Sequence, residues 1–451
     1  MGAREGQRSS IGATVSFMLS AWSNPDARMF NTDMVLVLAA AALPWSTSIF
    51  TILMALWFVS LLFNIEPRSL AALMRRPACW LPVALFGLAV LGMLWSAAPW
   101  SERIHAAGAV GKLLLLPLLL YHFQRSQRAT WVMLSFLISC LLLMAMSVVV
   151  LYQPGLTLKE DVFTGLAYEP ARGIFVKNYI DQSQEFALCV VALVHPVFHL
   201  FREGKVRQAL MLCAIALALL ASMLFVTVSR TAIVTIPIML AALAILHFRW
   251  RTSFLILSGL ILLALLAWTA SPSLRASTER FSIDYEEYQQ TGRPTSIGLR
   301  IEYWTKSLRF IADAPLFGHG TGSTRVLFER AKSGPEELVH AKVVSNPHNQ
   351  TLAFAIQWGA LGVIILYAMW IAHLTLFRGE GLMAWIGLLV VVQNMLTSLF
   401  NSHLVDFVPG WIYVLGVGIA GGTVLRAGIG HADAVSAASQ PASENTSRPA
   451  T

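Results

Sequence analysis

The sequence is dominated by long apolar blocks, most of which run for about 18 residues or more with almost no charge, long enough for a helix to cross about 30 Å of hydrocarbon. The alternating pattern of a membrane β-barrel is absent. Helices satisfy their own backbone hydrogen bonds in lipid, so the blocks are predicted to be transmembrane helices. The expected fold class is therefore an all-α polytopic membrane protein surrounded by membrane lipids.

Composition excludes the main alternatives. Hydrophobic residues make up 56% of the 451 residues and charged residues 12%, about half the usual share, which is too little charge to cover a soluble fold of this length. The net charge of +8 is compatible with nucleic-acid binding, but the Lys and Arg residues fall in short gaps between apolar blocks. No nucleic-acid partner is therefore expected.

The apolar blocks predict about twelve spans. Their approximate boundaries are 30–43, 46–63, 79–97, 104–123, 130–152, 182–201, 209–228, 231–248, 252–270, 349–373, 382–400 and 407–426. The first two blocks could instead form one helix broken at Pro44, which would reverse the orientation of every later segment.

The distribution of Lys and Arg decides between these two topologies. With twelve spans and a cytoplasmic N-terminus, the inside segments hold sixteen Lys and Arg, whereas the short outside segments hold six. This bias follows the positive-inside rule, from which a loop longer than about 60 residues is left out. Twelve spans with both termini in the cytoplasm are therefore predicted.

This topology divides the chain into five parts. They are a cytoplasmic N-terminus (1–29), nine spans with a medium outer loop at 153–181 (30–270), a large outer loop (271–348), three further spans (349–426) and a disordered cytoplasmic tail (427–451). Residues 1–28 lack the short apolar core of a signal peptide, so no removable one is expected. The large loop is predicted to fold against the membrane, partly as helices. This prediction rests on five apolar residues at helix-compatible spacing, which are Trp304, Phe310, Leu316, Phe317 and Phe328.

Cations on the outer side suggest an anionic substrate. The large loop carries ten Lys and Arg, Arg230 ends the seventh span, and Lys112 lies inside the fourth. A lysine within a span is a functional candidate by default, although it can also extend to lipid headgroups. Arginine pairs well with phosphate oxygens, so a lipid-linked phosphate or diphosphate fits best, with ordinary surface charge as the alternative for any single arginine.

His348 stands where the large loop re-enters the membrane. Pro347 is placed like a first-turn proline, so His348 is predicted in the first turn of the tenth span. The positive end of a helix disfavours imidazolium, which leaves the neutral form that a general base needs. A purely structural histidine is the alternative.

Two further features concern phosphate and metal binding. Gly318, Gly320 and Gly322 could cradle phosphate with backbone N–H groups or could simply form a tight turn. The sequence offers no paired-carboxylate or His-Glu-x-x-His motif, so neither a metal nor another cofactor is expected.

Several motifs together resemble a known family. The series Arg300-x-x-x-Trp304, Pro315-Leu-Phe-Gly-x-Gly-x-Gly and His348-Asn349 resembles the O-antigen ligase and polymerase superfamily. The ligase motif begins with a histidine that is followed directly by Asn, Ser or Gln. After nine further residues comes a glycine, and after two more comes Gly, Thr or Tyr. In this sequence the four positions are His348, Asn349, Gly359 and Gly362. Ser229-Arg230-Thr231-Ala232 is similar to another recurring element, and the topology extends the resemblance over nearly the whole chain.

The resemblance implies a multi-pass enzyme of the inner membrane of Gram-negative bacteria. Such a ligase moves polysaccharide from undecaprenyl diphosphate to the lipid A–core oligosaccharide on the periplasmic face. Its members are thought to invert the anomeric centre without a metal and to resemble the multi-span (GT-C) glycosyltransferases.

Roles for individual residues follow as hypotheses. Arg230 and Arg300 would hold the diphosphate, while His348 would take the acceptor proton or, as imidazolium, bind the diphosphate itself. The secondary candidates for the donor's phosphates are Lys112, Arg172, Lys177 and Arg309.

Three alternatives remain. O-antigen polymerases carry two motifs, one in each of two periplasmic loops, in which ten residues separate an Arg from a Gly. Arg309 and Gly320 match this motif in the large loop. In the medium loop the residue at that distance from Arg172 is Ser183, so the second motif is missing. This favours a ligase over a polymerase. A protein O-oligosaccharyltransferase would use the same donor. A transporter or lipid flippase is expected to have repeated halves, which this sequence lacks.

Overall fold

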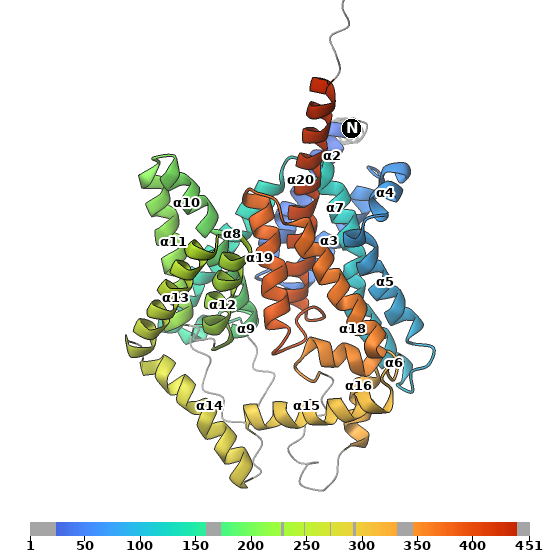
Figure 1. The fold of residues 1–451 in the computed structure, drawn as a ribbon, viewed down its shortest axis with the longest axis vertical. Coiled ribbons are helices and arrows are strands. Elements are labelled where there is room, and N and C mark those ends of the chain that lie inside the picture. The colour runs from blue at the N-terminus through green and yellow to red at the C-terminus, as the bar shows by residue number, and fades with distance from the viewer. Residues whose placement is uncertain are drawn as a thin grey trace, which may run out of the picture.

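The computed structural model describes residues 24–158, 173–226, 230–247, 249–270, 272–291, 295–331 and 346–439. Within these ranges the regular structure is entirely helical (Figure 1). The prediction of an all-α polytopic membrane protein is therefore confirmed for the described part of the chain.

Each predicted span corresponds to one helix or to two or three consecutive helices. These are α2 (Pro25–Ala42), α3 (Thr47–Leu62), α5 (Pro77–Leu91), α6 with η1 and α7 (Trp100–Gly111, Lys112–Leu114, Leu115–Arg125), α8 (Ala129–Tyr152), α9 with α10 (Tyr179–Ala192, Val194–Arg202), α11 (Val206–Phe225), α12 (Arg230–His247), α13 (Trp250–Ala270), α18 (Gln350–Leu376), α19 (Leu382–Thr397) and α20 (Phe407–Ser439). Six of them are long and apolar enough to cross a membrane, or seven if α3 and α4 (Pro67–Met74), bent by 116°, count as one broken span. The number twelve stays a prediction.

Pro44 separates α2 from α3. Helix α2 ends at Ala42, and α3 begins at Thr47 after Ser46, whose Oγ accepts a hydrogen bond from Ile49 N at 3.3 Å. This Ser cap satisfies one of the unpaired N–H groups at the start of α3. The two helices pack against each other and are not one broken helix.

Small residues let α7 and α20 approach closely. A Cβ on Gly418 would lie 2.4 Å from Leu119 Cβ, and a Cβ on Gly422 would lie 2.6 Å from Leu120 O. Close backbone contact over small residues is how helices pack where lipid removes the hydrophobic driving force. The two helices therefore pack closely against each other, and Tyr413 of α20 is fully buried.

The large loop carries helices of its own at one end of the bundle. They are α14 (Pro272–Thr291), α15 (Ser296–Asp313) and α16 (Ser323–Arg330), while α4 and the C-terminal part of α20 lie at the opposite end (Figure 1). Helix α15 lies across the end of the bundle and packs against α18, where Phe310, Phe328 and Ile356 form a small apolar cluster. Leu316 and Phe317 are exposed, so the predicted folding of this segment against the membrane stays a prediction.

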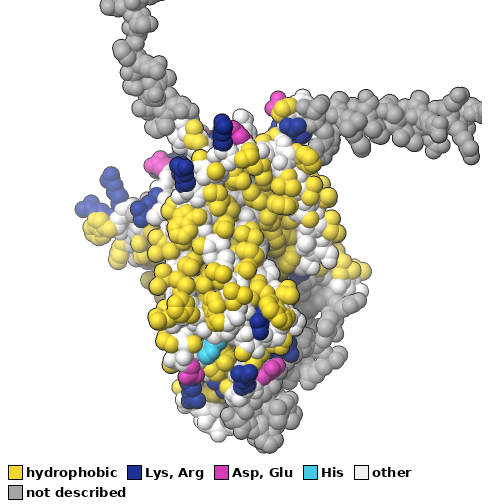
Figure 2. Space-filling view, turned by 90° about the vertical axis from the view of Figure 1, so that its right-hand side faces the viewer, with side chains coloured by type: hydrophobic (Ala, Val, Ile, Leu, Met, Phe, Trp, Pro, Cys, Tyr) yellow, Lys and Arg dark blue, Asp and Glu magenta, His cyan; other side chains and the backbone are white. Residues whose placement is uncertain are grey.

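The surface has the pattern of a membrane protein. Figure 2 shows apolar side chains across the middle of one face, with Lys and Arg toward its two ends. Helix α20 continues beyond the predicted end of the last span to Ser439, and the remainder of the predicted tail, 440–451, lies outside the described residues.

Candidate active site

His348 stands just ahead of α18. The helix begins at Gln350 because Asn349 is its cap, with Asn349 Oδ1 accepting from Leu352 N at 3.1 Å. The predicted place of His348 in the first turn is therefore wrong, since the side-chain cap and not Pro347 sets the start of the helix. His348 has a φ of +54°, uncommon outside glycine. Asn346 stabilises this turn, because its Oδ1 accepts from His348 N at 2.9 Å.

The imidazole of His348 has a defined orientation. Its Nδ1 lies 3.1 Å from Asn401 Oδ1. An amide oxygen only accepts hydrogen bonds, so Nδ1 carries the hydrogen and the lone pair of the neutral ring is on Nε2. The Tyr303 ring stacks on the imidazole with 6.3 Å between centroids, and Trp304 Nε1 donates to Pro347 O at 3.2 Å. Helix α15 thus covers the histidine.

The pKa of His348 is lowered from its ordinary value. Burial is the largest cause, and the positive charge of Arg300 acts in the same direction. The hydrogen bond that His348 Nδ1 donates to Asn401 Oδ1 and the negative charge of Asp406 oppose these two effects. Burial and the charge of Arg300 therefore both favour the neutral imidazole, which is the form that a general base needs.

The structure brings Arg300 to His348 but keeps Arg309 away. Arg300 lies three and four residues before Tyr303 and Trp304, on the α15 face that covers the histidine, and its charge acts on the imidazole. Arg309 follows nine residues later, about 13 Å further along the helix and on its opposite face, and it is exposed. Of these two arginines of α15, Arg300 is the one positioned to share a ligand with His348.

The other predicted cations do not gather around His348 within the described residues. Lys112 Nζ donates to the backbone oxygens of Val405, at 3.0 Å, and of Asp406. Lys177 Nζ donates to Leu43 O, and burial lowers the pKa of this lysine. Arg230 is the first residue of α12, but its side chain is not described, and Arg172 lies outside the described residues.

A polar network behind His348 was not predicted. In the connection between α19 and α20, Asn401 Nδ2 donates to Asp406 Oδ2 at 3.1 Å, and His403 Nδ1 lies 3.0 Å from the same oxygen. Gln184 of α9 donates to His403 Nε2 at 2.8 Å. The signal in the sequence was the group Asn401-Ser402-His403 followed by Asp406, at the predicted outer ends of two apolar spans.

The glycine-rich turn fills a break in α18 and does not form a phosphate cradle. Gly359 interrupts the helix with φ +59° and ψ −154°, a conformation that only glycine adopts readily. The N–H groups of residues 360 and 361 donate to the oxygens of residues 315 and 316, and the oxygens of residues 356 and 357 accept from the N–H groups of residues 319 and 320. The loop thus replaces the helical hydrogen bonds lost at the break.

The N–H groups of Thr321 and Gly322 are also occupied. Thr321 N donates to Gly92 O at 3.0 Å, and Gly322 N donates to Gln357 Oε1 at 2.8 Å. The tight-turn alternative is therefore correct, and the ligase-type spacing from His348 to Gly359 and Gly362 marks the segment between the candidate base and this break.

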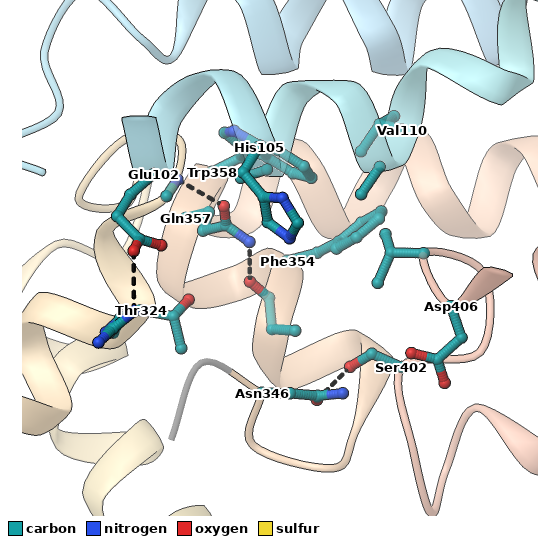
Figure 3. Close-up of a pocket in the computed structure, with 16 residues that line it drawn as sticks. Glu102, His105, Val110, Thr324, Asn346, Phe354, Gln357, Trp358, Ser402 and Asp406 are labelled. Carbon is teal, nitrogen blue, oxygen red and sulfur yellow. Dashed lines mark hydrogen bonds and ion pairs between the residues drawn. The ribbon is translucent and has the colours of Figure 1, made fainter. Parts of the chain in front are cut away.

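A pocket of about 200 Å³ lies beside the network (Figure 3). Its wall comes from α6, α18, the start of α16 and the connection between α19 and α20. The polar lining residues are Glu102, His105, Thr324, Arg325, Asn346, Gln357, Ser402 and Asp406. These elements are distant from one another in the sequence, so the pocket could not be predicted from it. Among the described residues no three His, Cys, Asp or Glu side chains are arranged to hold a metal ion.

Comparison with known proteins adds one finding. Residues 215–367 match the family model described as O-antigen ligase. This range extends from α11 through the large loop and includes Arg230, Arg300, His348 and the break at Gly359. No curated protein matches the chain.

Proposed function

We propose that this chain, whose residues 215–367 match the family model described as O-antigen ligase, is an O-antigen ligase. It transfers polysaccharide from undecaprenyl diphosphate to the lipid A–core oligosaccharide and so completes lipopolysaccharide on the periplasmic face of the inner membrane. The observation that carries the proposal is the pairing of a neutral, oriented His348 with Arg300, both at the end of the bundle that holds the large loop.

The reaction needs two things from the protein. Negative charge grows on the diphosphate as the bond between the sugar C1 and the phosphate oxygen breaks, and fixed cations such as Arg300 and Arg230 stabilise it by several kcal/mol. The acceptor hydroxyl forms the new bond to C1 from the opposite face, which inverts the configuration. His348 Nε2 takes the proton of that hydroxyl, and the diphosphate leaves with the electron pair of the broken bond.

The Arg309 and Gly320 match does not favour a polymerase. Arg309 is exposed on the α15 face away from His348, and Gly320 N donates to Gln357 O at 2.8 Å in the break of α18. The motif residues are thus on a solvent-facing surface and in a packed turn, which leaves the ligase as the better-supported function.

The test is a lipopolysaccharide gel from cells that lack the gene, complemented with wild type, His348→Ala, Arg300→Ala or Arg309→Ala. For a ligase, the deletion loses the surface polymer ladder while long polymer accumulates on undecaprenyl diphosphate. Wild type and Arg309→Ala restore the ladder, and the other two variants do not.

Two outcomes would refute the proposal. A deletion that leaves core bearing one repeat unit identifies a polymerase, and an unchanged ladder points to protein glycosylation or transport. Full transfer activity of purified His348→Ala would remove the histidine from the mechanism.

A further inference from the structure

The pocket beside the His348 network differs in charge from the His348 and Arg300 side. Two carboxylates, Glu102 and Asp406, line it. Its one guanidinium, Arg325, is already bonded to Glu102 Oε1 at 3.0 Å and to Glu329 Oε1 at 3.2 Å. Among the described lining residues a diphosphate would face two carboxylates and a guanidinium that is already paired, which disfavours the pocket as a second site for the donor's phosphates.

The remaining lining suits a ring that carries hydroxyl groups. Figure 3 shows His105, Gln357 and Phe354 on one side and Asn346, Ser402 and Asp406 on the other. Carboxylate and amide oxygens accept hydrogen bonds from sugar hydroxyls, and the alanine, valine and aromatic side chains of α6 and α18 offer an apolar surface to the C–H face of a pyranose. A volume of about 200 Å³ is below the roughly 300 Å³ of the smallest drug-sized sites, which suits one sugar unit better than a chain.

The pocket shares two residues with the His348 network. Asn346 Oδ1 accepts both from His348 N, at 2.9 Å, and from Ser402 Oγ, at 2.7 Å. Asp406 Oδ2 is held by Asn401, the residue that orients the imidazole. A ligand in the pocket therefore touches the groups that position the base.

From this geometry we infer that the pocket binds one uncharged sugar unit of the acceptor, next to the network that orients His348. The inference rests on the proposed function and divides the site into a cationic donor side and an acidic acceptor side. Recognition through carboxylates and amides also excludes phosphate-bearing ligands from this position.

The test fills the pocket without removing any polar group. Ala109 lines it, and Ala109→Leu places an isobutyl side chain inside. Gly108→Leu adds the same side chain on the neighbouring α6 residue, where a Cβ has no atom within 4 Å. In proteoliposomes with lipid-linked polysaccharide and lipid A–core, we expect Ala109→Leu to raise the KM for the acceptor at least tenfold with an unchanged KM for the donor. Gly108→Leu should behave as wild type.

A second measurement separates this inference from the proposed function. Delipidated core oligosaccharide is titrated onto the purified full-length protein in nanodiscs, which requires no turnover, and Ala106→Leu replaces Ala109→Leu if the latter does not fold. If wild type binds the saccharide and the filled variant does not, the pocket assignment holds even when transfer to lipid A–core fails. If transfer proceeds and the filled variant matches wild type in acceptor KM and saccharide binding, or if the donor KM rises instead, the assignment is wrong while the ligase function stands.

Discussion

His348 Nδ1 lies 3.1 Å from Asn401 Oδ1, which joins the segment ahead of α18 to the connection between α19 and α20. Asn401 in turn donates to Asp406, so the orientation of the imidazole depends on a loop about 50 residues further along the chain. In the proposed mechanism this hydrogen bond fixes the direction of Nε2, the nitrogen that would take the acceptor proton.

Removing Asn401 should therefore slow the reaction and shift its pH dependence. A general base contributes about 10²–10⁴ in rate, and we expect Asn401→Ala to lose about tenfold or more of this through misorientation. The hydrogen bond that His348 Nδ1 donates to Asn401 raises the pKa of His348, so its loss lowers that pKa further. The acid limb of kcat/KM then moves to lower pH, which a pH profile of the purified enzyme measures. A reduced rate with an unmoved acid limb would assign Asn401 a structural role only.

Arg300 should affect the pH profile in the opposite direction. Its positive charge lowers the pKa of His348, so Arg300→Gln raises that pKa and moves the acid limb to higher pH. Arg300→Lys keeps the charge and should leave the limb near its wild-type position while binding the diphosphate less well, because ammonium lacks the paired donors of guanidinium. Donor KM and pH profiles of both variants are the measurements, and identical acid limbs in the two would contradict the electrostatic coupling.

The sequence predicted well what a short segment determines by itself. Span positions follow from apolar length, which bilayer thickness fixes. His348 and Arg300 were found from local motifs, and the structure brings them together. The start of α18 was misplaced because Pro347 and Asn349 both suit the first positions of a helix, and only the hydrogen bond from Leu352 N decides between them.

Features that depend on distant segments were not predictable. The Asn401–Asp406 network and the pocket require the packing of α6, α9, α18 and the connection before α20. The glycine-rich turn was ambiguous because a phosphate cradle and a packed turn share the same residues. They differ in where the N–H groups point, and here the break at Gly359 supplies their acceptors.

The break in α18 should be essential to stability. Gly359→Ala places a Cβ 2.4 Å from Leu316 C in a conformation that costs other residues about 1–3 kcal/mol, and the clash adds to this. We expect a lower melting temperature and a weaker yield of folded protein, measured by thermal unfolding in detergent. Gly259→Ala in α13, where a Cβ has no atom within 4 Å, is the control and should melt as wild type does. Equal melting of both variants would show that the loop and the break tolerate rearrangement.

Lys112 offers a test between a substrate-binding and a structural lysine. Its Nζ donates to Val405 O and Asp406 O, so Lys112→Met leaves two acceptors without their donor next to the Asn401–Asp406 network. A buried unsatisfied group costs about 1–3 kcal/mol. We expect a lower melting temperature and a lower kcat with an unchanged donor KM, measured in the same proteoliposome assay. If Lys112 instead binds the donor's phosphates, Lys112→Met raises the donor KM while the melting temperature stays near that of wild type, and the lysine returns to the donor side of the site.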